Sequence, residues 1–425
     1  MSTALIMFGG LGAVFVGSAG LQLIHAIYES VRRSRFNRQA EQMSLALLAQ
    51  RIEAATAARA RRESAAPAWN GFRKFVVDQK EYEAENIYSF YFTAHDRKPL
   101  ANFMPGQFLT LQLKIPGIEK PVVRCYSLSD CSRPDYYRIS VKRCLPPPRE
   151  KKAPPGVVSS YLHDFVEKGD IIDIKAPSGQ FYLETHKQKP AVLIGGGIGV
   201  TPMLSMANAV IESDSTREIW MFYGVRNLRE PIHNGYLREL SHKHDHFNYV
   251  VCCSNPDPDD LQGRDFDHHG RIGTDLLKQY LKTNNYDFFI CGPPPLMSAL
   301  TQALAAWGVP KSDIRTEAFG PASVPKPKKK EATKAVAPEN AIKVEFSRSK
   351  KSANWDGTSN NLLDFGEDNG AIMQGGCRVG NCGTCEVAVL SGEVEYNCDP
   401  EYSDLGEGCC LACISTPKGK VVLDA

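Results

Sequence analysis

The sequence lacks an excess of charge of either sign. Lysine and arginine total 50, and aspartate and glutamate total 48, so no field of one sign favours nucleic acid as a partner. Cysteine is too sparse for a disulfide scaffold, because the chain has 13 cysteines among 425 residues. They gather toward the C-terminus, which indicates metal chemistry in a reducing compartment. A hydrophobic share of 43% with 23% charged residues also excludes a mainly disordered chain and a polytopic membrane protein.

One long segment lacks charge altogether. Residues 2–28 contain no Asp, Glu, Lys or Arg, and a helix of that length would cover about 40 Å, enough for a hydrocarbon core of roughly 30 Å. No basic region precedes the segment and no clear small-x-small cleavage site follows it, so we predict a single-pass transmembrane anchor over residues 1–28 rather than a secretory signal peptide. Arginines follow at once, at Arg32, Arg33, Arg35 and Arg38. The positive-inside rule therefore places the rest of the chain on the cytoplasmic side of the membrane.

The composition then divides the chain into further segments. Residues 29–71 predict a basic helical stalk, either solvated or bound to anionic lipid or a partner. Short alternating apolar runs over residues 72–186 predict an antiparallel β-barrel. Apolar strands alternate with helical stretches over residues 187–321, which predicts a parallel α/β domain. A linker rich in proline and lysine at residues 322–340 separates this domain from an acidic unit at residues 341–425.

The strongest motif is a cysteine cluster in the C-terminal unit. Cys377, Cys382 and Cys385 have the spacing C-x4-C-x2-C, and Cys413 follows after 27 further residues, which matches the plant-type [2Fe–2S] pattern. The glycines between these cysteines let the backbone wrap closely around a cluster with its N–H groups turned inward. A zinc site would need two CxxC-like pairs, and only one is present.

The fourth ligand has more than one candidate. Cys413 lies in an apolar stretch that can hold a sulfur rigidly, so we prefer it. The alternatives nearby are Cys398, Cys409 and Cys410.

A second motif lies in the predicted barrel, at Arg124-Cys125-Tyr126-Ser127. On a strand, Arg124 and Tyr126 share one face, where the guanidinium can bind a phosphate and the ring can lie on a flat heterocycle. The hydroxyl and N–H of Ser127 can then reach a ring nitrogen. Leu128 follows directly, and Lys142 lies on a second cationic strand.

A predicted helix start supplies a phosphate site for the same cofactor. It consists of Gly156, Val157, Val158 and Ser159, and its N-terminal N–H groups suit a pyrophosphate. That site favours FAD over FMN.

Two loops at strand ends predict a dinucleotide site in the α/β domain. The first follows the strand at residues 191–194 and contains Gly196, Gly197, Gly199 and Thr201; the second contains Cys291, Gly292 and Pro293. Glycines between a strand and a helix let the backbone approach a pyrophosphate, and ligands bind at the carboxyl ends of such strands. Arg226, after a third strand, could accept a 2′-phosphate or could simply be a surface arginine, which leaves NADH and NADPH open.

Taken together, residues 72–425 resemble the ferredoxin–NADP reductase superfamily, closest to the flavohaemoglobin reductase branch, followed by a plant-type ferredoxin domain with an α+β (β-grasp) fold. The resemblance implies that Arg124 binds the flavin phosphate, Tyr126 stacks on the isoalloxazine and Ser127 bonds near N5. It also implies that Cys291 abuts the nicotinamide. Glu317 and Phe319 resemble the tail that closes over the flavin. We therefore assign catalytic roles to Tyr126, Ser127, Cys291 and Glu317, and the resemblance favours NADH.

These modules imply an oxidoreductase for electron transport. A nicotinamide gives a hydride, an iron–sulfur cluster takes one electron at a time, and a flavin can do both, so the flavin must lie between them. The sequence has no globin, Rieske, di-iron or nucleophilic-triad pattern. We expect a reductase that serves a separate oxygenase, hydroxylase or desaturase, as in class-I oxygenase reductases. The alternatives are a respiratory NADH dehydrogenase that reduces a quinone or membrane complex, and a non-catalytic scaffold.

Overall fold

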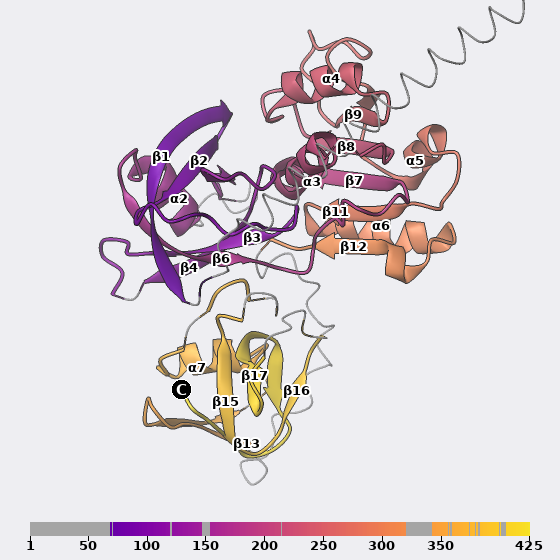
Figure 1. Ribbon diagram of the computed structural model, residues 1–425. Coiled ribbons are helices and arrows are strands. Elements are labelled where there is room, and N and C mark those ends of the chain that lie inside the picture. The colour runs from indigo at the N-terminus through magenta and orange to yellow at the C-terminus, as the bar shows by residue number, and fades with distance from the viewer. Residues whose placement is uncertain are drawn as a thin grey trace, which may run out of the picture. The chain divides into compact units, whose positions relative to one another are not determined.

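The computed structural model describes most of the chain beyond residue 68 (Figure 1). The described residues are 69, 71–119, 121–146, 154–213, 215–319, 342–355, 357, 359–373, 375–378, 380, 383–398, 400 and 405–425. The chain divides into two units, Met1–Ser64 and Ala65–Ala425. The predicted anchor, nearly all of the predicted stalk and the predicted linker lie outside the described residues. Within the described part, no helix is both long enough and apolar enough to cross a bilayer.

The first described domain is a six-stranded antiparallel sheet, in the strand order β4-β3-β6-β1-β2-β5. Its two edge strands meet through an antiparallel bridge between Leu128 and Ile139, which gives the predicted barrel. Alternate residues point inward and form a core with Phe75, Phe90 and Leu109 fully buried. The elements are β1 (Phe72–Ala84), β2 (Ile87–Ala94), β3 (Phe108–Leu113), β4 (Val122–Ser127), β5 (Tyr137–Lys142), α2 (Val157–Asp164) and β6 (Ile171–Ser178).

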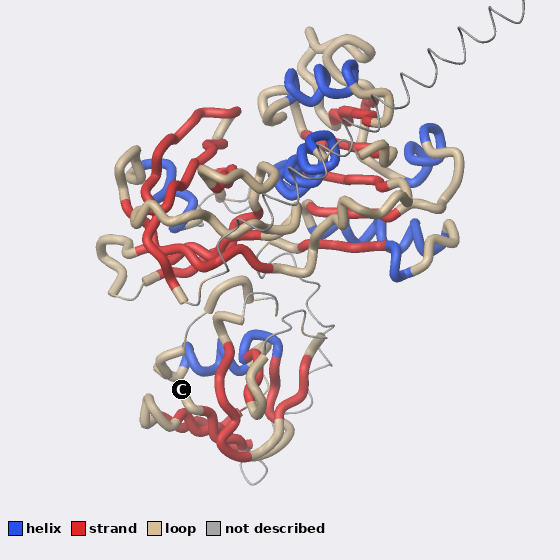
Figure 2. Tube along the Cα trace, in the orientation of Figure 1, coloured by secondary structure: helices blue, strands red, loops and turns tan. Residues whose placement is uncertain are grey.

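The second domain is a parallel sheet in the strand order β10-β9-β8-β7-β11-β12 (Figure 2). Its strands are β7 (Ala191–Gly196), β8 (Ile219–Val225), β9 (Phe247–Cys253), β10 (His268–His269), β11 (Asp287–Cys291) and β12 (Ile314–Glu317). Its helices are α3 (Val200–Glu212), α4 (Asn234–Lys243), α5 (Thr274–Tyr280) and α6 (Pro294–Ala306), with short 3₁₀ turns at Gly197–Gly199 and Lys311–Asp313. This is the predicted α/β architecture.

Strand β7 is buried on both faces, and its side chains alternate between two cores. Ala191 and Leu193 pack in the core with α3 and α4, whereas Val192 and Ile194 pack in the core with α5 and α6. The first of these cores also contains Phe181, from the segment that follows the barrel. A few residues in and after the barrel therefore pack in the first core of the α/β domain, while the barrel keeps a core of its own.

A buried ion pair fixes the amino end of this sheet. Arg217 is only 1% exposed, and its guanidinium donates to Asp287 at 2.7 Å and to the carbonyl oxygens of Lys189 and Glu184 at 2.5 and 3.0 Å. A buried guanidinium needs such partners because desolvation of an unpaired charge costs several kcal/mol. The contacts tie the segment between the two domains to strand β11.

The C-terminal domain has a mixed five-stranded sheet in the order β14-β13-β19-β15-β17, with a separate β16–β18 pair. Helix α7 packs on it through Leu362, Leu363 and Phe365, and its N-cap Asn361 accepts a hydrogen bond from the Asp364 N–H at 2.8 Å. Its strands are β13 (Ile342–Phe346), β14 (Lys351–Trp355), β15 (Glu386–Ser391), β16 (Val394–Tyr396), β17 (Cys409–Leu411), β18 (Ser415–Pro417) and β19 (Val421–Leu423), with α7 at Leu362–Asp368 and a 3₁₀ turn at Ala412–Ile414.

Candidate functional site

A cavity of about 430 Å³ lies where the barrel meets the α/β domain, a volume typical of small-molecule sites. Many of the predicted site residues line it together, although they come from six separate parts of the sequence. The lining includes Arg124, Tyr126, Ser127, Lys142, Gly156, Val157, Val158, Ser159, Thr201, Glu317 and Phe319, together with Gly376, Cys377 and Arg378. The predicted residues Leu128, Gly196, Gly197, Gly199, Arg226, Cys291, Gly292 and Pro293 lie outside the lining.

Strand β4 presents Arg124 and Tyr126 on one face, as its alternation predicts. The two residues pair with Leu111 and Leu109 of β3, and both line the cavity. Burial raises the pKa of the Tyr126 hydroxyl, so the side chain stays neutral and offers a flat ring. Arg124 is exposed and donates to the Val123 carbonyl at 2.7 Å, which leaves guanidinium N–H groups for a phosphate.

Helix α2 begins directly at the cavity. Gly156 is its N-cap, without a side-chain cap, and the first turn of a helix has N–H groups that lack intrahelical partners. An added Cβ at Gly156 would lie 2.7 Å from the Cβ of Cys144, so only glycine fits. The Ser159 hydroxyl accepts from the Cys144 N–H at 3.0 Å and donates to the Gly156 carbonyl at 3.1 Å. The Ser159 side chain therefore fixes this helix start by its hydrogen bonds to two backbone groups.

Ser127, Glu317 and Cys291 meet at the junction of the two domains. The Ser127 hydroxyl donates to Glu317 Oε2 at 2.9 Å, and the two residues are 5% and 6% exposed. Glu317 ends β12 and is the register partner of Cys291, which ends β11. Burial and the nearby Glu317 charge raise the pKa of Cys291 well above its usual value. Cys291 is therefore a neutral thiol. It lies beside the buried Glu317 carboxylate, which accepts a hydrogen bond from Ser127 of β4.

The two predicted nucleotide loops touch at the carboxyl edge of the sheet. Parallel pairing sets Gly195 opposite Cys291. An added Cβ at Gly199 would overlap the Cys291 carbonyl oxygen and lie 2.8 Å from the Gly292 nitrogen, and one at Gly196 would lie 2.9 Å from Pro293 Cδ. These glycines allow the close approach of two backbones at the edge where open α/β sheets bind ligands.

The end of β8 carries charges of both signs near the expected ribose position. The Arg226 side chain is exposed, and the backbone N–H of Arg226 donates to Glu230 Oε2 at 3.3 Å. The other oxygen of Glu230 accepts from Lys142 Nζ at 3.1 Å. Lys142 thus lines the cavity and also pairs with a carboxylate of the α/β domain. Sequence reasoning missed Glu230, because no motif marks it.

Of the four predicted cluster ligands, Cys385 and Cys413 are hydrogen-bonded and Cys377 lies near enough to affect Cys413 electrostatically, whereas Cys382 lies outside the described residues. Cys413 is 4% exposed. A hydrogen bond with Cys385, burial and the nearby Cys377 raise its pKa, while the Gly380 N–H is directed at its sulfur. Such packed sulfurs with backbone donors suit an iron–sulfur cluster, which holds its cysteines as thiolates. On their own, the described residues form no group of three or more His, Cys, Asp or Glu side chains that could hold a metal ion.

The alternative fourth ligands are placed differently. Cys398 is exposed. The thiol of Cys409 is hydrogen-bonded to Glu386, and that of Cys410 is hydrogen-bonded to Ser415. Burial raises the pKa of Cys410 to about 12. These positions favour Cys413.

Glycine conformation and one arginine shape the cluster loop. Gly380 has φ +82° and Gly383 has φ +66°, and an added Cβ at Gly380 would lie 2.7 Å from Ile414 Cδ1. Arg378, with φ +59°, donates to Asp364 at 2.7 Å and to both oxygens of Glu367, at 2.6 and 2.7 Å. Helix α7 thereby anchors the residue next to Cys377.

Comparison with known families identifies the three domains. Residues 74–182 match the oxidoreductase FAD-binding domain, residues 193–302 the oxidoreductase NAD-binding domain, and residues 344–418 the 2Fe-2S iron-sulfur cluster binding domain.

Among curated proteins, the similar chains include bacterial flavohemoproteins. The flavohemoprotein of Halalkalibacterium halodurans is 38% identical over 254 residues, which are 60% of this chain and 61% of that protein. The flavohemoprotein of Bacillus subtilis is 36% identical over 259 residues, which are 61% of this chain and 62% of that protein. The chain thus spans about three fifths of these relatives' length.

Among solved structures, the flavohem-like FAD/NAD binding domain of nitric oxide dioxygenase from Vibrio cholerae is 29% identical, with a TM-score of 0.52, and the match covers 59% of this chain and 100% of that one. Phthalate dioxygenase reductase is 25% identical, with a TM-score of 0.52, and the match covers 84% of this chain and 98% of that one.

The fold, the cavity and these matches show flavin- and nicotinamide-binding oxidoreductase domains together with an iron–sulfur domain, a class of domain arrangement like that of phthalate dioxygenase reductase. Within that class, the chain combines an FAD-binding barrel, an NAD-binding domain and a C-terminal [2Fe–2S] domain. The predicted domain types and cofactors are therefore confirmed. The roles of individual site residues and the domain limits stay predictions.

The glycine contacts predict the effect of Gly199→Ala. The added methyl would overlap the backbone of Cys291, which cannot move as a flexible side chain does, so we expect a loss of about 1–3 kcal/mol in the free energy of unfolding. We expect weaker NADH binding as well. Gly235→Ala is the control, because its Cβ would meet nothing within 4 Å in the first turn of α4. Thermal unfolding and NADH titration measure both variants, and equal stability would contradict the close approach.

The cysteine positions predict different outcomes for two serine variants. Cys413→Ser should abolish the cluster, measured as iron and acid-labile sulfide per chain and as visible absorbance, because a buried ligand is lost. Cys398→Ser is the matched control and should retain about two irons per chain. Loss of iron in Cys398→Ser alone would move the fourth ligand to Cys398.

Proposed function

We propose that this protein is a membrane-anchored reductase that passes electrons from NAD(P)H through FAD and the [2Fe–2S] cluster to a separate acceptor protein. The single observation that supports this best is the Ser127–Glu317 hydrogen bond at 2.9 Å. It joins the predicted flavin strand to the end of the nucleotide-binding sheet, beside the cavity. FAD, when bound, would supply the chemistry, because a flavin can take a hydride and release electrons singly.

In this proposal the residues of the chain bind and orient the flavin and the nicotinamide. Arg124 would hold the flavin phosphate by charge-assisted hydrogen bonds, and the neutral ring of Tyr126 would support the flat face of the flavin. Ser127 and Glu317, which are hydrogen-bonded to each other in the cavity lining, would present a hydroxyl and a carboxylate to a flavin bound there. Cys291, a neutral thiol, would flank the nicotinamide without adding charge. None of these residues has to act as a nucleophile.

Several finer points belong to the same proposal. NADH is the preferred donor, because the Glu230 carboxylate lies against the turn at Arg226 and a carboxylate suits a free ribose hydroxyl. The acceptor is an oxygenase, hydroxylase or desaturase; the similarity to phthalate dioxygenase reductase over 84% of the chain supports this class. The uncharged residues 2–28 and the arginines after them support a single-pass anchor with the cofactor domains on the cytoplasmic side.

The linear electron path predicts that two activities can be separated. A chain that ends after residue 321 should keep NADH:ferricyanide activity, because the barrel and the α/β domain have their own cores. It should lose most reduction of cytochrome c, which takes electrons through the cluster. The full-length variant Cys385→Ser should show the same two results, retained ferricyanide activity and lost cytochrome c reduction. Because it keeps the C-terminal domain, it separates the effect of losing the cluster from the effect of losing the domain. Equal loss of both activities would contradict the path.

The anchor makes its own prediction. Full-length protein should sediment with membranes and resist alkaline carbonate, because a spanning helix is held far more firmly than a surface helix. Deletion of residues 1–66 should release the enzyme with ferricyanide turnover nearly unchanged, while transfer to a membrane-bound acceptor falls with the lost effective concentration. Release of the full chain by carbonate, or a mature N-terminus beyond residue 28, would overturn the anchor.

A further inference from the structure

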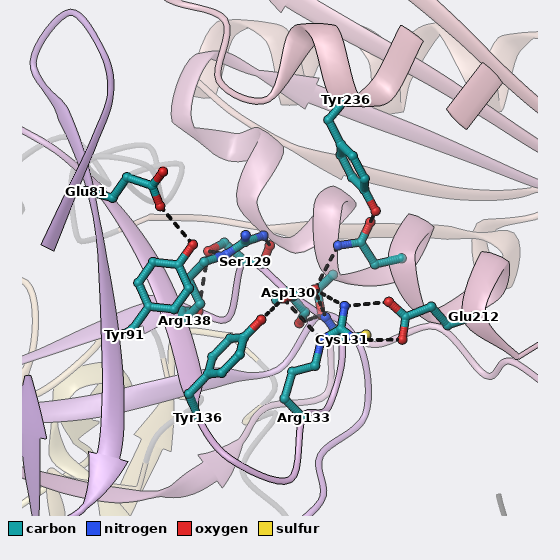
Figure 3. Close-up of polar contacts among 12 residues, drawn as sticks. Glu81, Tyr91, Ser129, Asp130, Cys131, Arg133, Tyr136, Arg138, Glu212 and Tyr236 are labelled. Atoms are coloured by element: carbon teal, nitrogen blue, oxygen red, sulfur yellow. Dashed lines mark hydrogen bonds and ion pairs between the residues drawn. The ribbon is translucent and has the colours of Figure 1, made fainter. Parts of the chain in front are cut away.

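A buried carboxylate lies at the centre of a polar network between the barrel and the α/β domain (Figure 3). Asp130, three residues beyond Ser127, is 4% exposed. Its oxygens accept from Asn208 Nδ2 at 2.8 Å, from the Tyr136 hydroxyl at 2.8 Å and from the Cys131 N–H at 2.8 Å. No sequence motif marks this residue.

One face of helix α3 supplies the α/β-domain side of the network. Ser205, Asn208 and Glu212 follow the i, i+3, i+7 spacing, which brings side chains to one side of a helix. Ser205 donates to the Asp130 carbonyl at 2.7 Å, and Glu212 accepts from both terminal nitrogens of Arg133, at 2.8 Å for Nη1. We call Asp130, Arg133, Ser205, Asn208 and Glu212 the Asp130 cluster.

The barrel side of the Asp130 cluster is itself held firmly. Arg138 donates to the carbonyl of Ser129 and, at 3.2 Å, to its hydroxyl oxygen. The Ser140 hydroxyl donates to Ser129 Oγ at 2.9 Å and is hydrogen-bonded to Ser89 at 2.7 Å. Strands β2 and β5 thereby fix the turn that carries Asp130, so the turn cannot move independently of the barrel.

The amide of Asn208 has a defined orientation. The Tyr236 hydroxyl, from helix α4, donates to Asn208 Oδ1 at 3.0 Å. That contact leaves the amide NH₂ group to face Asp130. The carboxylate is also ionised at neutral pH: burial raises the Asp130 pKa, but Arg138, Asn208 and Arg133 together bring it below its usual value. The hydrogen bonds across the interface are therefore charge-assisted, which makes them shorter and stronger than neutral ones.

The cluster is adjacent to both halves of the proposed reaction site. On the barrel side it begins three residues after Ser127, which lines the cavity. On the other side, Ser205 lies one helical turn beyond Thr201, which also lines the cavity, and α3 begins where the glycine-rich loop ends. A shift of α3 along the barrel would therefore move the nucleotide loop relative to the flavin strand.

We propose that the Asp130 cluster is a positioning element that sets the separation of the nicotinamide and flavin sites for hydride transfer, an inference that rests on the proposed function. In that step the C4–H bond of NADH breaks, and its hydrogen moves with both electrons to N5 of oxidised FAD, leaving NAD⁺ and two-electron-reduced flavin. Reacting atoms must approach to about 3–3.5 Å, and a displacement of about 1 Å can cost about 100-fold in rate.

Asn208→Ala in the full-length protein tests this proposal. It removes the donor to Asp130, and Asn208 itself is not among the residues that line the cavity. In anaerobic stopped-flow mixing with NADH, the limiting rate of flavin reduction should fall about 10- to 100-fold. The apparent Kd for NADH should change less than about 3-fold, and FAD content should stay unchanged. With NADH deuterated at the transferred C4 position, the isotope effect should rise above that of the unaltered chain, because a longer transfer distance makes the hydride step more rate-limiting.

Two further variants keep the result interpretable. Tyr236→Phe removes only the hydroxyl that orients Asn208, so it should give a smaller fall in the same rate even if Asn208→Ala folds poorly. Asp96→Ala breaks an ion pair with Arg73 that lies wholly within the barrel, and it should leave the rate unchanged.

The opposite results are equally clear. A limiting rate within about 2-fold of the unaltered chain for both Asn208→Ala and Tyr236→Phe, or a fall that only follows loss of FAD, would overturn the positioning role while leaving the proposed function intact. Failure of NADH and NADPH to reduce the flavin of the unaltered chain would instead overturn the proposed function, and this inference with it.

Discussion

The hydrogen bond from Ser127 to Glu317 joins two domains that each carry half of a redox site. Both groups are almost fully buried, and removing one partner of a buried hydrogen bond costs more than the bond itself contributes. The bond therefore holds Ser127 of the barrel against the last residue of β12. Cys291, the register partner of Glu317, and the adjoining glycine loop lie at the same edge. The cavity and the nucleotide loops adjoin this junction, and the Asp130 cluster begins three residues after Ser127.

Cysteine has two different chemical roles in this chain, and its surroundings decide which. Cys291 is wholly buried beside a carboxylate, so its pKa is raised and it remains a neutral thiol. Cys413 is also buried, but it lies with Cys385 and Cys377 and a backbone N–H points at its sulfur. Without metal, packed thiols resist ionisation; iron makes the same packing favourable, because it binds the thiolate form. The loop glycines provide the donors that such a site needs.

Much of the site could be predicted from the sequence, because its chemistry depends on local spacing. The Arg124–Ser127 motif needs only the alternation of a strand, the glycine loop needs only a strand followed by a helix, and the cluster ligands follow a fixed spacing. The three cofactor domains and their fold classes were confirmed for this reason. Asp130, Asn208 and Glu230 could not be found this way, since their partners lie about 75 to 90 residues away in the sequence. Only the docking of two domains brings them together, and a buried carboxylate in a loop has no periodic signal.

The order of electron transfer is tested most directly by one anaerobic experiment on the full chain. The protein is mixed rapidly with NADH while the flavin and iron–sulfur absorbance bands are followed in the same trace. The path through FAD predicts that the flavin band falls first and that the cluster band then falls at a rate independent of NADH concentration. Reduction of the cluster while the flavin stays oxidised, or a cluster that remains oxidised beside reduced flavin, would contradict it.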